Sequence, residues 1–461
     1  MTVEVITRMN ERNGTSGVTL VVGAGLAGLT AAYRWRQRGE DVVLAEKAPY
    51  VGGMARSHYR NGFTFDFGPH FIIEKTPLLD ELFAPDELVA FGPEIHMVLG
   101  GRWIRYPFTP SSMLKVPLGV QMDFLRTRAL GPRPGVDYGP PDSFRRNMSR
   151  QFGRGLYDFF FRPYLTKKFG GWDISDVVHS DWWAMATHTR GVVTRFAPPA
   201  PQTGHAVGAL RKLARLTKEL PYVFRKLALW YPKAGFGEIP KRIAEQFIHN
   251  GGVIRLNCQI SQIRRTENRI TGVVVDGEEI PVRRLIWTAS PNLLARMLGT
   301  SSLDMPTLHS IIYFISTDRR YRRRGTEVRP VDPEFAFYRA YFPETIWEGL
   351  TPGGRSAVVA EVGTTNRDDL AKAGEKYGAI IDTCVALGLF PRNAVTDIFH
   401  DVQPDCYPVY PLDYETHLQK YYSELTPIQN LLLAGRNARF QYYNSHQVIR
   451  DGERTVEDVL F

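Results

Sequence analysis

The stretch VTLVVGAGLAGLTAAYRWRQRGEDVVLAE, from Val18 to Glu46, decides the fold. It opens on the short apolar run Val18–Val22, which is typical of a buried parallel strand. A glycine-rich turn, a helix-compatible segment over Leu29–Arg38 and a second strand over Asp41–Ala45 follow. The order strand, Gly-x-Gly-x-x-Gly, helix, strand and acid predicts a Rossmann-like α/β unit that binds a dinucleotide.

The three glycines of this turn each have a physical role in that prediction. Gly23 permits the tight turn, Gly25 lets the backbone approach a pyrophosphate, and Gly28 lets the helix pack closely on the strand. The first turn of the helix, with Leu26 and Ala27, then presents the positive end of the helix dipole to the phosphates. We expect all five residues to contact the cofactor.

The acid at the end of the second strand selects the kind of dinucleotide. Glu46 stands 18 residues after Gly28 and is placed to accept hydrogen bonds from a ribose 2′-hydroxyl. An acid in this place disfavours a 2′-phosphate, so NADP is not expected. A glycine-rich turn without a ligand is the alternative, and the register of strands, helix and acid argues against it.

Composition sets wider limits. The chain has 461 residues, of which 43% are hydrophobic, and its net charge is +9. This length allows two or three domains, and the apolar content excludes disorder and collagen-like repeats. The positive surplus is mild: it suits contact with anions but does not argue for a nucleic-acid partner.

Cysteines and apolar runs indicate the compartment. Cys258, Cys384 and Cys406 form no close pair, which excludes a disulfide framework and a zinc ribbon, and no metal site is expected. Residues 1–17 read as a polar extension without the apolar run of a signal peptide. No stretch reaches the roughly 18 apolar residues of a membrane span. We expect a cytoplasmic protein without an integral membrane segment, and a homodimer is compatible with this.

A second glycine pair follows the acid. The segment runs from Lys47 through Gly52, Gly53, Met54 and Ala55 to Arg56. It resembles the flavoprotein superfamily of amine oxidases, phytoene desaturases, protoporphyrinogen oxidases and UDP-galactopyranose mutases. The resemblance implies that the cofactor is FAD and that this loop follows the FAD diphosphate and ribityl chain, with contacts from Lys47, Gly53, Met54, Ala55 and Arg56.

The resemblance continues along the chain. Gly68-Pro69-His70 is similar to a segment that lies against the flavin ring in the mutase and protoporphyrinogen oxidase branches. The block from Tyr231 to Pro240 resembles the return of oxidase-type members to the FAD domain. Further cofactor contacts implied in this way are Ile260 beside the adenine, and Gly435, Arg436, Asn444 and Ser445 near the C-terminus.

These positions divide the chain into interleaved domains. We expect a discontinuous FAD-binding domain of the glutathione-reductase type over residues 18–75, 230–295 and 425–461. Residues 76–229 and 296–424 would form an inserted α+β substrate-binding domain. The first insert is mostly helical in pattern, and the apolar runs of the second predict strands over the flavin.

The substrate residues follow from the mutase resemblance. The segment from Gly435 to His446 is similar to the mutase motif in which Arg436 lies beside flavin and phosphates and Tyr442 donates to a substrate phosphate. The segment from Tyr164 to Gly170 is similar to one that holds the nucleotide part of the substrate. Phe169 and Asn444 replace the mutase Trp and Asp. Residues expected to bind substrate are therefore Tyr164, Phe169, Arg190, Tyr410 and Tyr442, with plain core packing as the alternative for Tyr164 and Phe169.

Together these features predict an FAD-dependent dehydrogenase or oxidase. We expect it to remove hydride from an alcohol or amine carbon of a polar, sugar-like substrate, with His70, Arg436 and Tyr442 as catalytic residues. His70 is the first candidate for the base because its ordinary pKa suits neutral pH.

Three alternatives remain open. The first is a mutase-like sugar isomerase that uses reduced flavin. The second is a protoporphyrinogen oxidase or desaturase, which needs an apolar pocket and a membrane-facing helix that the basic, proline-broken insert does not clearly offer. The third is an FAD-binding partner protein without catalysis. The basic run Arg319–Arg324 is interpreted as a solvated loop rather than a site for phosphate, nucleic acid or lipid.

Overall fold

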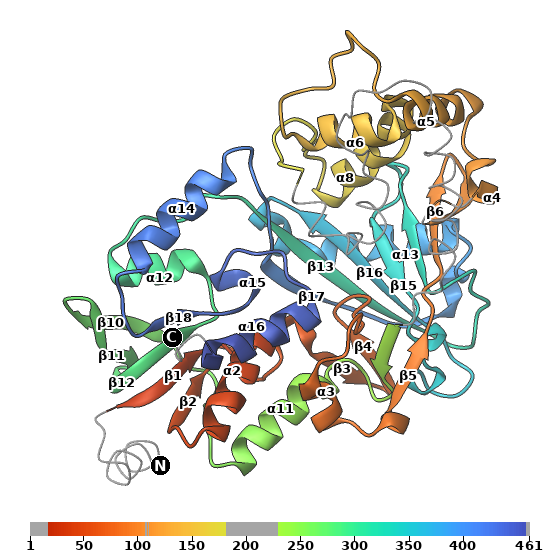
Figure 1. Ribbon diagram of the computed structural model, residues 1–461. Coiled ribbons are helices and arrows are strands. Elements are labelled where there is room, and N and C mark those ends of the chain that lie inside the picture. Colours follow the sequence, from red (N-terminus) through yellow and green to blue (C-terminus); the bar gives the residue numbers. More distant parts are fainter. Residues whose placement is uncertain (1–16, 107, 109, 181–228, 458–461) are drawn as a thin grey trace.

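The computed structural model describes residues 17–106, 108, 110–180 and 229–457. The polar extension expected at the N-terminus lies outside these residues except for Gly17. Two seven-stranded sheets, each with its own helices, make up most of the molecule (Figure 1).

The first sheet carries the glycine-rich turn. Its strand order is β10-β11-β12-β1-β2-β9, and β18 pairs with β12. The bounds are β1 Val18–Val22, β2 Val42–Ala45, β9 Val253–Arg255, β10 Ile260–Thr266, β11 Arg269–Val275, β12 Glu278–Trp287 and β18 Leu431–Leu433. β1 pairs in parallel with β2 and β12, and its residues are all buried, as its apolar sequence predicts. The α/β Rossmann-like fold is confirmed.

Helices from distant parts of the chain pack beside this sheet. α2 (Leu26–Gln37) lies next to both α11 (Glu238–His249) and α16 (Ser445–Glu457) (Figure 1). The inward face of α2 is formed by small and apolar residues, so neighbouring helices approach it closely. Four further helices belong to this half: α3 Pro77–Leu82, α12 Pro291–Leu298, α14 Tyr414–Leu425 and α15 Gly435–Ala438.

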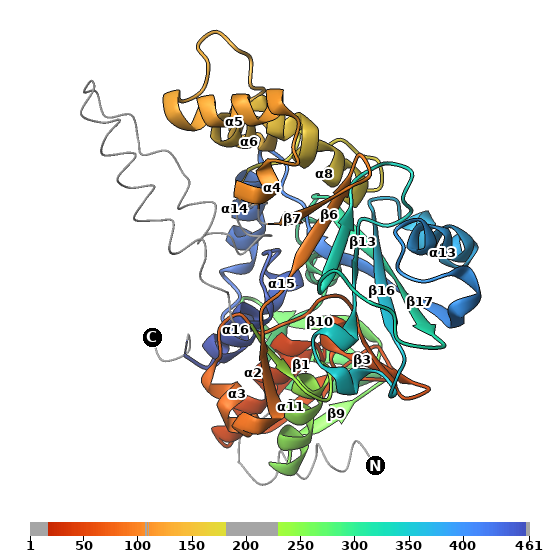
Figure 2. The same cartoon turned by 90° about the vertical axis from the view of Figure 1, so that its right-hand side faces the viewer.

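The second sheet has the order β17-β13-β16-β15-β14-β6-β7. Its bounds are β6 Ile95–Leu99, β7 Arg102–Tyr106, β13 Thr307–Thr317, β14 Glu327–Pro330, β15 Arg339–Tyr341, β16 Ala357–Thr364 and β17 Val395–Pro408. Helix α13 (Tyr377–Ala386) covers one face (Figure 2). Two small sheets, β3 (Ser57–Arg60) with β4 (Phe63–Asp66) and β5 (Leu88–Phe91) with β8 (Leu229–Pro232), lie near its lower end.

A helical group forms the outer end of the molecule in both views (Figures 1 and 2). It comprises α4 Pro110–Met113, α5 Leu118–Leu130, α6 Phe144–Phe152, α7 Arg154–Leu156 and α8 Arg162–Lys168. A π-helical turn over Tyr157–Phe161 separates α7 from α8, where the apolar spacing predicts one regular helix.

The buried residue Asp66 joins the small sheet of β3 and β4 to the second sheet. Asp66, at the end of β4, accepts hydrogen bonds from the hydroxyls of Ser57 and Tyr231 and from the backbone N–H of Phe236. Its backbone N–H donates to the Tyr341 hydroxyl of β15 over 3.0 Å. Burial raises the pKa of Asp66 to about 6, although the hydrogen bonds oppose the shift.

This raised pKa makes the stability of the fold depend on pH with a definite sign. Between pH about 4 and 6 the folded chain keeps a proton on Asp66 that the unfolded chain has released. The contribution of Asp66 to the free energy of unfolding therefore falls as the pH rises through this window, by up to about 3 kcal/mol. Urea unfolding of wild type and Asp66→Asn, subtracted at each pH, measures it.

A second variant checks the assignment. Tyr231→Phe removes one donor to the carboxylate, so the pH window should move upward. Tyr50→Phe, at a side chain that is 42% exposed, is the control. A wild-type minus Asp66→Asn difference that stays flat or grows with pH would contradict this account.

Candidate active site

The turn between β1 and α2 is crowded at two glycines and open at the third. A Cβ atom on Gly28 would overlap the carbonyl oxygen of Gly23, and one on Gly23 would overlap the Thr288 hydroxyl. At Gly25 no heavy atom lies within 4 Å of the Cβ position. Bare backbone therefore borders open space at the start of α2, where the helix N–H groups have no partner within the helix. This arrangement fits a diphosphate.

Glu46 is fixed at the end of β2 by two backbone N–H groups. One carboxylate oxygen accepts from Ala24 over 2.7 Å and the other accepts from Ala48 over 2.8 Å. Each oxygen retains a lone pair for a ribose hydroxyl. The chain that leads into β10 passes next to it, because Cys258 N–H donates to the Glu46 carbonyl over 2.9 Å. Half-buried Ile260 opens that strand, and Lys47 is exposed.

Two further glycine loops meet the same turn. Gly52 N–H donates to the Ala24 carbonyl over 2.7 Å, and a Cβ on Gly53 would lie 3.4 Å from the Cα of Gly25. A Cβ on Gly435 would lie 2.7 Å from the Cβ of Ala27. Met54 and Ala55 follow in a short 3-10 helix, Gly53–Ala55. The loops expected to hold FAD thus lie side by side, and together their residues fit that cofactor.

Arg56 connects this region to the second sheet. Its guanidinium donates to the Gly53 carbonyl over 2.7 Å and to the Asp401 carboxylate of β17 over 2.7 Å. It also lies 3.9 Å from the centroid of the Phe67 ring. His58 Nε2 lies 3.1 Å from the same Asp401 oxygen. Arg56 is therefore already engaged in a tie between sheets, and its contact with a diphosphate stays a prediction.

Where the Gly68-Pro69-His70 loop reaches the second sheet, it meets a buried ion pair. A Cβ on Gly68 would lie 3.7 Å from Arg339 Nη2 and 3.7 Å from Glu361 Oε2. Arg339 Nε donates to Glu361 over 2.9 Å, and Ser310 donates to the other oxygen over 2.8 Å. Burial favours the neutral acid, but the charge of Arg339 and its hydrogen bond hold the pKa of Glu361 below its usual value.

Two more cations flank this pair, and we call Lys168, Arg339, Glu361 and Arg436 the charged cluster. The Tyr407 ring lies between two of its members, with Lys168 Nζ 5.3 Å and Arg436 Cζ 4.9 Å from the ring centroid. Burial, reinforced by the positive charge of Arg339, lowers the pKa of Lys168 to about 7. A lysine in this state can exchange a proton near neutral pH.

Arg436 is held by the backbone of its own loop and of β17. Its Nε donates to the Tyr443 carbonyl over 3.0 Å, and its Nη1 donates to the Cys406 carbonyl over 3.2 Å. Tyr442 stacks on Tyr407 with ring centroids 5.1 Å apart. The structure therefore brings the expected residues Arg436 and Tyr442 together beside the charged cluster.

His70 belongs to the same region but is a poor base. Burial, with Arg436 and Arg339 next in importance, lowers the pKa of His70 to about 4. Its Nδ1 atom is buried without a hydrogen-bond partner. The imidazole is neutral at neutral pH and has little affinity for a further proton, which counts against the expected base role.

The remaining expected site residues are mostly engaged in packing. Tyr164 is 4% exposed and Phe169 is fully buried in the core. The Tyr410 hydroxyl donates to the Phe440 carbonyl and accepts from the Tyr442 N–H, so Tyr410 shapes the loop that carries Tyr442. Asn444 N–H donates to the Gln447 side chain three residues on, whereas the Ser445 hydroxyl donates to the carbonyl of Phe71, next to His70, and Arg190 lies outside the described residues.

The sequence prediction missed Lys168, Arg339, Glu361 and Tyr407. Glu361 carried a usable signal, since it is an acid that follows the apolar run Ala357–Ala360. Among the residues that the structure describes, no group of His, Cys, Asp and Glu could hold a metal ion.

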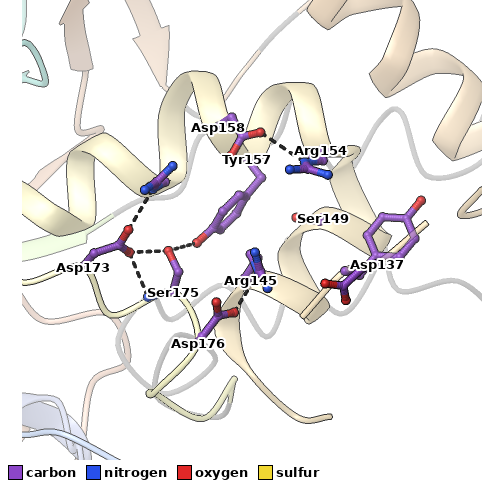
Figure 3. A pocket seen from close by; sticks show the side chains of 11 residues that line it. Asp137, Arg145, Ser149, Arg154, Tyr157, Asp158, Asp173, Ser175 and Asp176 are labelled. Carbon is purple, nitrogen blue, oxygen red and sulfur yellow. Dashed lines mark hydrogen bonds and ion pairs between the residues drawn. The ribbon is translucent and has the colours of Figure 1, made fainter. Parts of the chain in front are cut away.

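A separate polar hollow lies in the helical group (Figure 3). Its acidic and basic side chains form the pairs Arg162–Asp173 at 2.8 Å, Arg145–Asp176 at 2.7 Å and Arg154–Asp158 at 3.5 Å. Three of its four aspartates are paired with its three arginines, and the fourth, Asp137, accepts from the Gly139 N–H over 2.8 Å, so we assign the hollow to the bracing of this helical group.

Solved structures share the fold over nearly the whole chain. Reduced UDP-galactopyranose mutase has a TM-score of 0.74 at 20% identity, covering 96% of this chain and 95% of that one. A putative protoporphyrinogen oxidase from Exiguobacterium sp. 255-15 has 0.74 at 16% identity, covering 96% and 99%. Putrescine oxidase bound to putrescine has 0.60 at 17% identity, covering 96% and 99%. At these identities the likeness shows the fold alone.

Curated relatives overturn the expected substrate class. Phytoene dehydrogenase of Streptomyces griseus is 26% identical over 66% of this chain and 61% of its own length. A 4,4'-diapophytoene desaturase of Methylomonas sp is 24% identical over 76% of this chain and 73% of its own. The chain thus spans about three-fifths of the first of these relatives. These proteins are named for polyenes, so the prediction of a sugar-like substrate is wrong.

The physical reason for this error lies in the motifs used. The mutase-like segments at Tyr164–Gly170 and Gly435–His446 include side chains that the fold needs for packing, such as Phe169 and Phe440. The similarity of these segments therefore reflects a shared fold and does not indicate a shared substrate.

The glycine turn yields a sharp prediction. Gly25→Ala should leave the fold intact, because the Cβ position is open and the backbone φ is −73°. It should weaken FAD binding at least about tenfold, because the methyl group occupies space that the diphosphate needs. Fluorescence titration of FAD into apoprotein measures the affinity, and urea unfolding measures the fold. Gly378→Ala, at another glycine whose Cβ position is open, is the control. Unchanged FAD affinity of Gly25→Ala would refute a diphosphate site at this turn.

Two protein families match the sequence. An NAD(P)-binding Rossmann-like domain matches residues 21–84, and the flavin-containing amine oxidoreductases match residues 136–460, which is well over half of the chain. The expected superfamily and the FAD cofactor are confirmed. The chain belongs to the flavin-containing amine oxidoreductase family.

Proposed function

We propose that this protein is an FAD-dependent desaturase that introduces a carbon–carbon double bond into a polyene-type isoprenoid. The observation that carries the proposal is its similarity to desaturases of phytoene and diapophytoene over 56–76% of the chain. The glycine cradle and the charged cluster beside the Gly68–His70 loop supply a suitable site.

The reaction removes two hydrogens from adjacent carbons. One leaves with its electron pair, the other leaves as a proton, and the remaining electron pair forms the new π bond. FAD supplies the acceptor for the hydride when it is bound. The protein must therefore hold the hydrocarbon, exclude water and accept the proton.

Buried aromatic side chains suit the first two tasks. Tyr338, Tyr407 and Tyr442 surround the charged cluster, and each is at most 8% exposed. Burial raises the pKa of all three hydroxyls, with Tyr407 at about 12, so they stay neutral at neutral pH. Their rings offer apolar surface to a polyene.

Lys168 is the candidate proton acceptor. Its pKa of about 7 leaves a substantial fraction of the amine neutral at neutral pH. Arg339 disfavours a second positive charge beside it, while Glu361 remains ionised and provides a counter-charge for positive charge that develops on the substrate.

Substitution of this lysine tests the assignment. Lys168→Met should lower kcat by about a hundredfold or more, because no amine remains to accept the proton. The wild-type rate should fall as the pH drops through about 7, because the protonated amine cannot act as a base, and the variant should lose this limb of the profile. Single-turnover flavin reduction measures both.

The neighbouring lysine offers a matched control. Lys167 lies on the same helix, but its Nζ donates to the Asp332 carbonyl and lies 5.3 Å from the centroid of the Phe335 ring. Lys167→Met should keep the wild-type pH profile. An unchanged profile in Lys168→Met would remove Lys168 from the mechanism.

The proposed function itself is tested by anaerobic mixing of the FAD-loaded protein with phytoene or diapophytoene in detergent micelles. Loss of the visible absorbance of oxidised flavin, together with a product of longer conjugation, is the expected result. Flavin that stays oxidised with both compounds would refute the proposed function.

A further inference from the structure

Helix α5 has its apolar side facing outward. Leu118, Met122 and Leu125 are 71%, 59% and 58% exposed, and their spacing of four and three residues places them on one face of the helix. Exposed Ala129 continues this stripe, and Leu130 at the end of the helix is 75% exposed. A surface helix normally shows the reverse pattern, with apolar residues inward.

The inward side of α5 is anchored by polar groups. Asp123 accepts from Gly155 N–H over 2.8 Å and pairs with Arg133 at 3.2 Å. Thr127 is the helix's buried residue, and partly buried Val120 and Phe124 pack on the main core. The orientation of α5 is therefore fixed by contacts on one side, and the helix itself lies at the outer end of the molecule (Figures 1 and 2).

Basic residues border the stripe. Arg126 and Arg128 lie on α5 itself, one to either side of the stripe by helical spacing. Arg102, Arg105 and Lys115 lie in the segment before the helix, and Arg133 after it is paired with Asp123, the one acidic side chain of residues 101–135. An exposed apolar stripe with a basic border has the character of a helix that lies in the interface of an anionic lipid bilayer.

The positive charge also argues against two other partners for the outward face of α5, namely a second copy of the chain and residues 181–228 of the same chain. A second copy of the chain would bring the same basic border against itself, which is unfavourable. Residues 181–228 of the chain also have more basic than acidic side chains, so they would not neutralise it. An anionic lipid surface complements both the apolar and the basic part.

We propose that α5, with its basic border, docks the protein on anionic membrane surfaces. No helix within the described ranges is long and apolar enough to cross a membrane, so the contact is interfacial. The inference deepens the proposed function and rests on it for its purpose, since a polyene substrate resides in lipid. The structure thereby provides the membrane-facing helix that the sequence did not reveal.

Flotation of the full-length, FAD-loaded protein with vesicles tests this proposal. The protein should float with phosphatidylcholine vesicles that contain phosphatidylglycerol, less with pure phosphatidylcholine, and less at high salt. The triple variant Leu118→Gln, Met122→Gln, Leu125→Gln should lower the partition coefficient at least about tenfold. Its flavin spectrum and its turnover in detergent should remain those of wild type.

A matched triple variant removes exposed apolar side chains elsewhere. Ile248→Gln, Leu256→Gln and Val385→Gln alter side chains that are 55%, 37% and 38% exposed, and partitioning should stay within about twofold of wild type. Failure to float with anionic vesicles, or equal flotation of the α5 variant, would overturn the proposal. So would a dimer in ultracentrifugation that the α5 variant dissociates in the absence of vesicle binding.

The two proposals can fail separately. Vesicle binding is measured without substrate, and polyene turnover is measured in detergent without vesicles. Vesicle binding without polyene turnover would refute the proposed desaturase activity but not the membrane contact. Polyene turnover without vesicle binding would refute the membrane contact but not the desaturase activity.

Discussion

Backbone segments from distant parts of the chain meet at the first turn of α2, and the rest of the structure depends on this close approach. A side chain at Gly28 would overlap the β1 turn, and the Cβ position of Gly452 in α16 lies 2.7 Å from the carbonyl oxygen of Ala27. Gly435, which follows β18, also lies against this turn, because a Cβ there would lie 2.7 Å from the Cβ of Ala27. Since only bare backbone fits between these elements, the cofactor site and the closing helix are assembled by one packing constraint.

The second sheet is held to this centre by buried polar contacts. Asp66 of β4 bonds to Tyr341 of the second sheet. Arg56, which follows the Gly52–Gly53 pair, bonds to Asp401 of β17 in the same sheet. Such contacts are costly to break singly, since a buried polar group that loses its hydrogen-bond partner costs about 1–3 kcal/mol. They fix the position of the Gly68–His70 loop against Arg339 and Glu361, and so bring the charged cluster to the side of the flavin site.

One end of the helical group places a charged side chain in the buried cluster, and the other end presents apolar side chains to the outside. This arrangement suits a substrate that is dissolved in lipid. The C-terminal end of α8 delivers Lys168 into the buried cluster, while α5 presents Leu118, Met122 and Leu125 outward. Between them, matched ion pairs brace the group (Figure 3). A protein built in this way can rest on a membrane without a spanning segment, and its charged cluster stays buried away from the surface.

The sequence by itself determined the Rossmann-like unit, because the glycines, strands and Glu46 act through local spacing that the chain shows directly, and the resemblance of motifs such as Gly52–Arg56 to known flavoproteins indicated the FAD cofactor and the superfamily. It did not determine the charged cluster, since Lys168, Arg339, Glu361 and Arg436 come from separate elements that only the folded chain brings together. It also misjudged the substrate, because local motifs reflect the scaffold that relatives share. Only the tertiary structure decided that the apolar stripe of α5 faces outward: helical spacing shows that residues share a face, but packing decides which side that face is on.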